Sequence, residues 1–545
     1  MSKTKIDVRK SMARAEEGIM QFEFKRVACL ISAALSALFV VSLCPAAQAQ
    51  IVVNSTGDEG PYPNKVYVCD VDPVTPGNQC TLRAAIETVN GLAGTDTIQF
   101  QIPTSDPGYN PQTRSYTINL GNLLPNLSTD INITGPGASK LTVQRALGSF
   151  NFRIFNVTGS GTVNISKLTI ARGQATGAVG GGVLNAGTGR VNISDCTFAN
   201  NFGALGGAVG NYNASGPAGT VTITNCDLRN NAASGFGGAI ENHGGTVTIS
   251  RSKVRANFAV FASGGIDSTG SLTVTDTAVT DNRVITGTDP NAASGGGISS
   301  AGTTTLTRCT VSGNSARGHD GDTNQPSPSN AAGGGIYSLD TALNIINCTV
   351  SGNSAEGGNA LDFAGNQAAG GGIVFTGTGN CKVSNSSIAG NSATGGYSPE
   401  GAGTGFGGGI YRDGGTVTVK NSIISNNSAT TSGPDVYGTF ISQGFNLIGK
   451  KDGSTGFNIA TDLKGTVNAP LDPKLGLLQN NGGPTQTMAV QTGSPAIDKG
   501  TSVTIAGTTL TTDQRGNGFP RKIDDPAVPN ATGGDGTDIG AFELQ

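Results

Sequence analysis

Short stretches of alternating apolar and polar residues return nine times between residues 160 and 430. Each copy follows the pattern V-x-I-x-x-C-x-V-x-x-N, as in VNISDCTFANN from Val191 and VTITNCDLRNN from Val221. Alternation with a period of two predicts a short β-strand with one buried face, and β-branched residues favour that face. No helical period accompanies the pattern, which excludes leucine-rich, ankyrin and TPR arrays.

A glycine signature precedes most copies and ends in Ile or Val, as in GGAV at 206–209, GGAI at 237–240 and GGGI at 295–298. Successive Ile/Val positions lie 26 to 38 residues apart. One such strand cannot bury its face alone, but the same strand of the next repeat can stack on it at about 4.8 Å. The sequence therefore predicts an all-β fold, a parallel β-helix solenoid whose nine coils span roughly 40 Å.

An asparagine column closes almost every repeat, and only the first copy, with Gly173, breaks it. Asparagine tolerates the left-handed backbone of a tight turn, and a stacked amide can donate to one neighbour and accept from the other. We therefore interpret the column as a structural ladder without a catalytic role. Its members are Asn201, Asn231, Asn257, Asn282, Asn314, Asn353, Asn391 and Asn427.

A second column holds Cys196, Cys226, Cys309 and Cys348 at equivalent positions. In-register stacking points neighbouring side chains in parallel, so we expect buried thiols that act as small hydrophobic groups. The alternative is a disulfide or a metal site between coils.

Both ends of a solenoid need caps. The segment CTLRAAIETVNGL (80–92) places Leu82, Ala85, Ile86 and Val89 on one helical face, and we expect this helix over the N-terminal mouth. The predicted domains are an N-terminal cap (50–112), the β-helix (113–450) and a C-terminal cap (451–545). The turn-rich residues 470–545 are expected to cover the far end.

Four linkers that follow the asparagine turn are lengthened. All occupy the same place in the repeat, so they should emerge from one edge of the solenoid. Such insertions can build a binding face, or they can be neutral loop growth that costs little. The linkers are residues 283–294, 316–332, 355–369 and 393–406.

The first 49 residues predict a secretory signal peptide. Lys25 and Arg26 precede an apolar run over 27–44, and Ala47 and Ala49 occupy the small-residue positions of a cleavage site. The alternative is an uncleaved membrane anchor, because 18 residues of this kind could just span a bilayer. We expect a secreted or surface-displayed chain with no membrane span after cleavage.

Composition agrees with this interpretation. Glycine supplies 84 of the 545 residues, charged residues supply 13%, and the formal net charge is −3. The glycine lacks a G-X-Y period, which excludes collagen, and the chain lacks the basic character of nucleic-acid-binding proteins. Much of the glycine falls in the repeated signatures and in turns, where the chain must bend tightly.

The end motifs carry a resemblance to known proteins. CTLRAAIETVN with the downstream TDTIQF resembles the CSLREA domain of secreted bacterial β-helix proteins. NNGGPTQTMAVQTGSPAIDKG, DQRGNGFPR and the terminal DIGAFE are similar to the choice-of-anchor Q domain, and the repeats are similar to those of chlamydial polymorphic membrane proteins. The resemblance implies a right-handed, pectin-lyase-like β-helix that is secreted or displayed at the surface, with no implied enzymatic activity.

Candidate catalytic residues are few. Glycoside hydrolysis needs paired carboxyl groups, but Asp267, Asp276 and Asp281 are scattered along the chain and are expected to be solvated. The two histidines are His243, beside Glu241, and His319. Neither lies in a motif of a polysaccharide-cleaving enzyme, so we assign no catalytic residue.

Two further sites can be proposed from residue types. Asp320, Asp322 and Asn324 alternate as oxygen ligands of Ca²⁺ do, although the turn glycine and the closing glutamate of a calcium loop are missing. A polar loop without metal is the alternative, and no other cofactor is predicted. Cys69 and Cys80, in a loop rich in Asp, Pro and Gly, are candidates for a disulfide in a secreted chain, with two unpaired thiols as the alternative.

Three functions remain open. The first is a monomeric binding or adhesion protein that contacts an extracellular polysaccharide or a surface protein through the loop edge or a strand face. The second is a polysaccharide lyase or another carbohydrate-active enzyme. The third is a structural exoprotein without a specific ligand.

Overall fold

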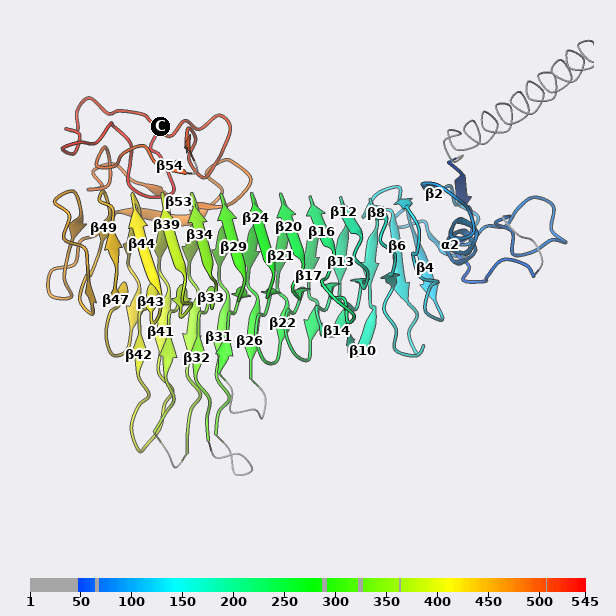
Figure 1. The fold of residues 1–545 in the computed structure, drawn as a ribbon, viewed down its shortest axis with the longest axis horizontal. Helices are drawn as coiled ribbons and strands as arrows, with labels where there is room; N and C mark the ends of the chain where they lie inside the picture. Colours follow the sequence, from blue (N-terminus) through cyan, green and yellow to red (C-terminus); the bar gives the residue numbers. More distant parts are fainter. Residues whose placement is uncertain (1–47, 64–67, 287–291, 322–326, 362–363, 506) are drawn as a thin grey trace, which may run out of the picture.

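The protein is a parallel β-helix, as the sequence predicts. Its computed structural model describes residues 48–63, 68–286, 292–321, 327–361, 364–505 and 507–545. The chain winds through stacked coils whose strands form four long sheets, here called A, B, C and D, and a shorter sheet E (Figure 1). Within the described residues, no helix is long and apolar enough to cross a membrane.

Sheet A holds the strand that the alternating pattern predicts. At its inward positions the Val and Ile side chains are buried inside the coil, as at Val191 and Ile193, and the Thr, Ser and Asn side chains between them face outward. Neighbouring strands pair in parallel without a shift, so that Val191 lies opposite Val163 and Val221. The strands are β1 (Gln50–Val53), β2 (Asp96–Phe100), β5 (Ile131–Thr134), β8 (Thr162–Ser166), β12 (Arg190–Ser194), β16 (Thr220–Thr224), β20 (Thr246–Ser250), β24 (Ser271–Thr275), β29 (Thr303–Thr307), β34 (Ala342–Ile346), β39 (Asn380–Ser384), β44 (Thr416–Lys420) and β48 (Ile441–Ser442).

Sheet B follows sheet A after a tight bend, at the residues just past the cysteine column. Its strands are β3 (Tyr109–Asn110), β4 (Ser115–Leu120), β6 (Leu141–Arg145), β9 (Thr169–Ala171), β13 (Thr197–Ala199), β17 (Asp227–Arg229), β21 (Lys253–Arg255), β25 (Ala278–Thr280), β30 (Thr310–Ser312), β35 (Thr349–Ser351), β40 (Ser387–Ala389), β45 (Ile423–Ser425), β49 (Leu447–Ile448) and β51 (Leu463–Lys464).

Sheet C contains the Ile/Val that ends each glycine signature. Its strands are β7 (Phe155–Val157), β11 (Val183–Asn185), β15 (Val209–Asn211), β19 (Ile240–Asn242), β23 (Ile266–Ser268), β28 (Ile298–Ser300), β33 (Ile336–Ser338), β38 (Ile373–Phe375), β43 (Ile410–Arg412), β47 (Val436–Thr439) and β50 (Ser454–Thr455). Together with the strands of sheet D described below, most coils therefore use four strands where the repeat pattern alone shows one clear alternation.

Sheets D and E lie between the asparagine turn and the next glycine signature. The strands of sheet D are β10 (Gln174–Val179), β14 (Phe202–Leu205), β18 (Ala232–Ala233), β22 (Phe258–Ala259), β26 (Arg283–Ile285), β31 (Ser315–Arg317), β36 (Ser354–Glu356), β41 (Ser392–Thr394) and β46 (Ser428–Ala429). Sheet E contains β27 (Ala293–Ser294), β32 (Ala331–Ala332), β37 (Ala368–Ala369) and β42 (Gly405–Phe406).

The described parts of the four lengthened linkers emerge from one edge, as expected, and stack into a projection that we call the wing (Figure 1). In it, β26, β31, β36 and β41 run outward, and β27, β32, β37 and β42 return beside them. Small side chains such as Ala316, Ala331 and Ala355 are buried between these strands. The described part of the wing is thus closely packed on itself.

The asparagine column forms a continuous hydrogen-bonded ladder inside the coil. Each amide Nδ2 donates to the Oδ1 of the next coil, from Asn201 to Asn231 at 2.9 Å through to Asn391 and Asn427 at 2.8 Å. At the last rung Asn427 donates to Asp435 Oδ1 at 2.9 Å. Gly173, which lacks an amide side chain, closes the other end by donating its backbone N–H to Asn201.

One detail of the ladder differs from the expectation. The left-handed backbone belongs to the residue before each ladder asparagine, such as Asn200 (φ 56°), Asn230 (φ 54°) or Gly313 (φ 64°). The ladder residue itself is free to turn its amide inward, because the sharp turn is made one position earlier.

The cysteine column is a second ladder. The backbone N–H of Cys196 donates to Cys226 Sγ at 3.4 Å, and that of Cys226 donates to Ser252 Oγ at 3.0 Å. Cys309 donates to Cys348 Sγ in the same way, and Cys348 to Ser386 Oγ. Cysteine, serine and threonine can alternate at this position because each offers a small hydrogen-bond acceptor. The cysteines therefore accept hydrogen bonds in addition to packing as small hydrophobic groups.

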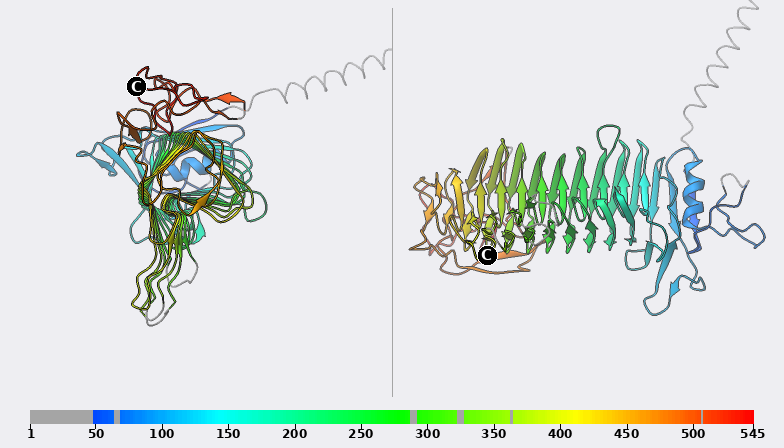
Figure 2. Two further views of the ribbon diagram at one scale, coloured as in Figure 1. Left: turned by 90° about the vertical axis from the view of Figure 1, so that its left-hand side faces the viewer. Right: turned by 90° about the horizontal axis from the view of Figure 1, so that it is seen from below.

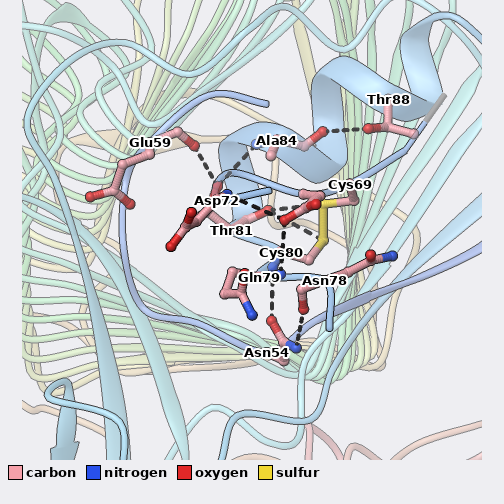
Figure 3. The surroundings of a disulfide bond; sticks show 11 residues. Asn54, Glu59, Cys69, Asp72, Asn78, Gln79, Cys80, Thr81, Ala84 and Thr88 are labelled. Carbon is pink, nitrogen blue, oxygen red and sulfur yellow. Dashed lines mark hydrogen bonds between the residues drawn. A yellow bond between two sulfur atoms is a disulfide. The ribbon is translucent and has the colours of Figure 1, made fainter. Parts of the chain in front are cut away.

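The helix α2 (Leu82–Asn90) lies over the N-terminal mouth, as expected, and is seen through the coil in the end-on view of Figure 2. Thr81 caps it by accepting the N–H of Ala84 at 3.1 Å. Cys80, directly before the cap, forms a disulfide with Cys69, shown in Figure 3. The bridge joins the preceding loop to the start of the helix.

The C-terminal segment differs from its expected position. Residues 454–464 form a last partial coil through β50 and β51, but the chain from β52 (Leu475–Gln479) onward lies along the side of the solenoid and not over its end (Figure 1). It includes β53 (Thr487–Val490), β54 (Thr504–Ile505) and β55 (Thr508–Thr509). The reason is a set of polar contacts with the A–B bend of several coils, from Arg308 to Asn421.

Gln514 is the most connected of these contacts and is fully buried. Its Nε2 lies within hydrogen-bond distance of Cys309 O (3.2 Å) and Gln486 O (3.1 Å), and its Oε1 accepts from Thr349 Oγ1 at 2.6 Å. It belongs to the DQRG motif, whose Arg515 pairs with Asp513 at 2.7 Å. These residues hold the segment against the solenoid.

Candidate functional site

A groove of about 560 Å³ lies between the outer face of sheet A and the C-terminal segment. Its floor is the row of outward-facing side chains Thr305, Asn344, Lys382 and Thr418, which the parallel register places on four adjacent strands. Three strand spacings make this row about 14 Å long. The floor is straight and regular because every strand of sheet A alternates in the same phase.

A second row runs beside the first and contains Ile346, Ser384 and Lys420. The wall opposite is formed by Val503, Thr504 and Ile505 at and before β54. Apolar Ile346, Val503 and Ile505 thus meet the hydroxyl, amide and ammonium groups of the floor. Such a mixture can hold a ring with an apolar face and polar substituents.

The charge of the groove is positive. Lys382 and Lys420 lie on neighbouring strands, one in each row, and no acidic side chain is among the described residues that line the groove. Neither lysine takes part in an ion pair within the part of the chain that the structure describes. Their ammonium groups can therefore serve an anionic ligand without first losing a carboxylate partner.

The residues selected from the sequence for calcium binding are only partly described. Asp320 accepts a bidentate hydrogen bond from Arg317 Nη2 at 2.8 and 3.0 Å and a further one from the N–H of Asn359. Asp322 and Asn324 lie outside the described residues. Within the described ranges, no group of three or more His, Cys, Asp or Glu could hold a metal ion, and the calcium site stays a prediction.

The scattered acidic residues have different surroundings. Asp276 forms an ion pair with Arg308 at 2.6 Å, and Asp281 is exposed, as expected. The expectation for Asp267 is wrong, because this side chain is buried against Glu241 of the neighbouring coil. On strands β19 and β23 of sheet C, the residue after the signature isoleucine is buried together with its neighbours on the strand.

The histidines do not meet one another. His243 Nδ1 lies 3.9 Å from Glu241 Oε1, and its imidazole contacts the ring of Tyr212. His319 lies in the wing, where its backbone N–H donates to Ser329 Oγ at 2.7 Å. Neither histidine lines the groove, so the structure brings no general base of this type to it.

The free thiols have no catalytic surroundings. Cys196, Cys226, Cys309, Cys348 and Cys381 are all buried. Burial raises the pKa of Cys196 and Cys309 well above the usual range and that of Cys381 to about 12. A thiol in this state is a poor nucleophile.

Comparisons with known proteins add little beyond the fold. No protein-family model and no curated protein matches the chain. Among solved structures, pectate lyase Pel9A matches with 12% identity over 92% of this chain and 98% of its own, at a TM-score of 0.37. The A-module of the Azotobacter vinelandii mannuronan C-5 epimerase AlgE6 matches with 14% identity over 71% of this chain and 89% of its own, at a TM-score of 0.28.

Proposed function

We propose that the protein is a secreted or surface-displayed binding protein that holds an acidic extracellular polysaccharide in the sheet A groove. The observation that carries the proposal is the pairing of Lys382 and Lys420 with polar and apolar neighbours along a straight floor. Lysine ammonium groups suit carboxylate or sulfate substituents, and Thr, Asn and Ser side chains suit sugar hydroxyls.

The shape of the groove supports a polymer as the ligand. The floor row continues beyond Thr305 through Thr273, Thr248 and Thr222 on the preceding strands of sheet A. A chain that leaves the groove along the solenoid axis would therefore meet further hydroxyl groups at the same spacing. The described lining offers binding groups and not the paired carboxyl groups of glycoside hydrolysis.

Replacement of both lysines by glutamine tests the proposal. We expect the double variant Lys382→Gln/Lys420→Gln to bind polygalacturonate about a hundredfold more weakly, because two charge-assisted hydrogen bonds are lost. Isothermal titration measures the Kd, and added salt should weaken binding of the unmodified protein. A neutral polymer such as dextran should bind weakly to both.

The control removes the same charge elsewhere. Lys140 and Lys167 are exposed and distant from the groove, so Lys140→Gln/Lys167→Gln should leave the Kd unchanged. Equal loss of affinity in both double variants, or equal binding of dextran and polygalacturonate, would contradict the proposal. Release of unsaturated sugars from polygalacturonate would favour the lyase alternative.

A further inference from the structure

Two acidic side chains meet on sheet C, away from the groove. Parallel pairing of β19 and β23 places Glu241 directly opposite Asp267. Glu241 is 3% exposed and Asp267 is 9% exposed. Adjacent strands lie about 4.8 Å apart, so the two carboxyl groups share one small, largely buried region.

The pair lacks a buried counter-charge. Within the described part of the chain, Glu241 Oε2 has no hydrogen-bond partner, and no Lys or Arg forms an ion pair with either acid. Among the described residues, His243 is the one titratable base facing the pair, 3.9 Å from Glu241 Oε1, and its side chain is 57% exposed. The neighbouring strands β15 and β28 contribute Gly210 and Ser299 at the same register, which carry no charge.

A strained serine supports the arrangement. In the other coils the first residue of the glycine signature is a glycine with positive φ, such as Gly237 (64°) and Gly295 (66°). Ser263 occupies the equivalent position with φ 58°, a backbone conformation that disfavours a side chain. Its buried hydroxyl donates to Asp267 Oδ1 at 2.7 Å, so that the exceptional residue is the one that serves the acid pair.

We propose that Glu241 and Asp267 form a proton-binding switch, which retains a proton in the folded coil and opens this part of the solenoid as the surroundings become alkaline. Ser263 donates to the Asp267 carboxyl group and so favours the retained proton on Glu241. Two neighbouring buried carboxyl groups cannot both ionise without a large free-energy penalty. The proposal is independent of ligand binding in the groove. The pair stabilises this part of the solenoid more in acidic than in alkaline surroundings.

The direction of the pH effect follows from the proton balance. Burial, and secondarily the charge of Asp267, raises the pKa of Glu241 from 4.5 to about 9. Burial also raises the pKa of Asp267, against the hydrogen bonds of Ser263 and Ser299, which lower it. Between pH 4.5 and about 9 the folded chain binds more protons than the unfolded chain. The contribution to stability is therefore fully present below pH 4.5 and is lost as the pH rises toward 9.

Chemical denaturation of the full chain at a series of pH values tests the switch. For each proton retained on folding, the unfolding equilibrium constant should rise about tenfold per pH unit. Glu241→Gln removes one titrating group. Compared with the unmodified protein, this variant should lose one factor of about ten per pH unit from the rise of its unfolding equilibrium constant. Asp267→Asn should also reduce the dependence of the unfolding constant on pH. This variant replaces Glu241→Gln in the test if Glu241→Gln does not fold.

The matched control is Asp281→Asn, an exposed acid at a turn position where other coils carry asparagine. Its profile should run parallel to that of the unmodified protein. Hydrogen exchange at pH 9 should show lost protection over residues 237–268 first, and Glu241→Gln should restore it. Parallel profiles for Glu241→Gln and the unmodified protein, or opening that begins in another coil, would overturn the proposal.

Discussion

Replacing Asn314 with alanine is expected to lower the free energy of unfolding by about 4 kcal/mol. The Asn314 amide accepts from the N–H and the Nδ2 of Asn282 at 3.0 and 2.9 Å. It donates to Val279 O and to Asn353 Oδ1, both at 2.9 Å. Alanine removes all four of these bonds in the buried interior. The N–H of Asn282 loses its side-chain acceptor, whereas Asn282 Nδ2 keeps its bond to Val254 O and Asn353 Oδ1 keeps the bond from the Asn314 N–H. Each lost buried bond costs about 1 kcal/mol.

The midpoint of chemical denaturation measures this effect. Asn192 is the matched control, because it also belongs to a column of stacked asparagines, where its Nδ2 donates to Asn164 Oδ1 at 2.8 Å. That column lies on the outer face of sheet A, where water replaces the lost bond, so Asn192→Ala should cost less than about 1 kcal/mol. An equal loss of unfolding free energy at the two positions would show that burial of the ladder does not increase its contribution to stability.

Replacement of Gln514 by alanine should release the C-terminal segment from the solenoid, at a cost of about 3 kcal/mol. The change removes the hydrogen-bond acceptor of buried Thr349 Oγ1 and the donor to Cys309 O. Because the residues at 503–505 form one wall of the groove, affinity for polygalacturonate should fall together with stability. Limited proteolysis of residues 475–545 measures the release, and titration measures the affinity.

Gln479→Ala is the control for this prediction, since Gln479 is exposed on β52 and its amide contacts only Asn481 across the described residues. It should change neither protease sensitivity nor affinity. If Gln514→Ala released the segment while binding stayed intact, the wall at 503–505 would have no part in the site.

The fold could be predicted because one physical pattern recurs in every coil. The alternation around Val191 and Ile193 identifies the buried face, and the asparagine column identifies the turn. The position of the left-handed residue could not be read as directly, since Asn200 and Asn201 are the same residue type and only the backbone distinguishes them.

The candidate site was only partly visible in the sequence. Lys382 and Lys420 stand at outward positions of the alternating pattern, and Glu241 and Asp267 both follow a signature isoleucine, so aligned repeats contain the signal for each pair. The wall at 503–505 is different. The position of this wall depends on contacts such as that of Gln514 with Cys309. These two residues are 205 positions apart in the chain, and their contact follows no repeat pattern.

Lysine acetylation followed by mass spectrometry, with and without saturating polygalacturonate, tests the central claim most directly. We predict that the polymer protects Lys382 and Lys420 from acetylation. Exposed lysines on other faces, such as Lys140 and Lys253, should react at an unchanged rate. Unchanged reaction of Lys382 and Lys420 at saturating polymer, or protection spread evenly over all lysines, would contradict the assignment of the groove as the binding site.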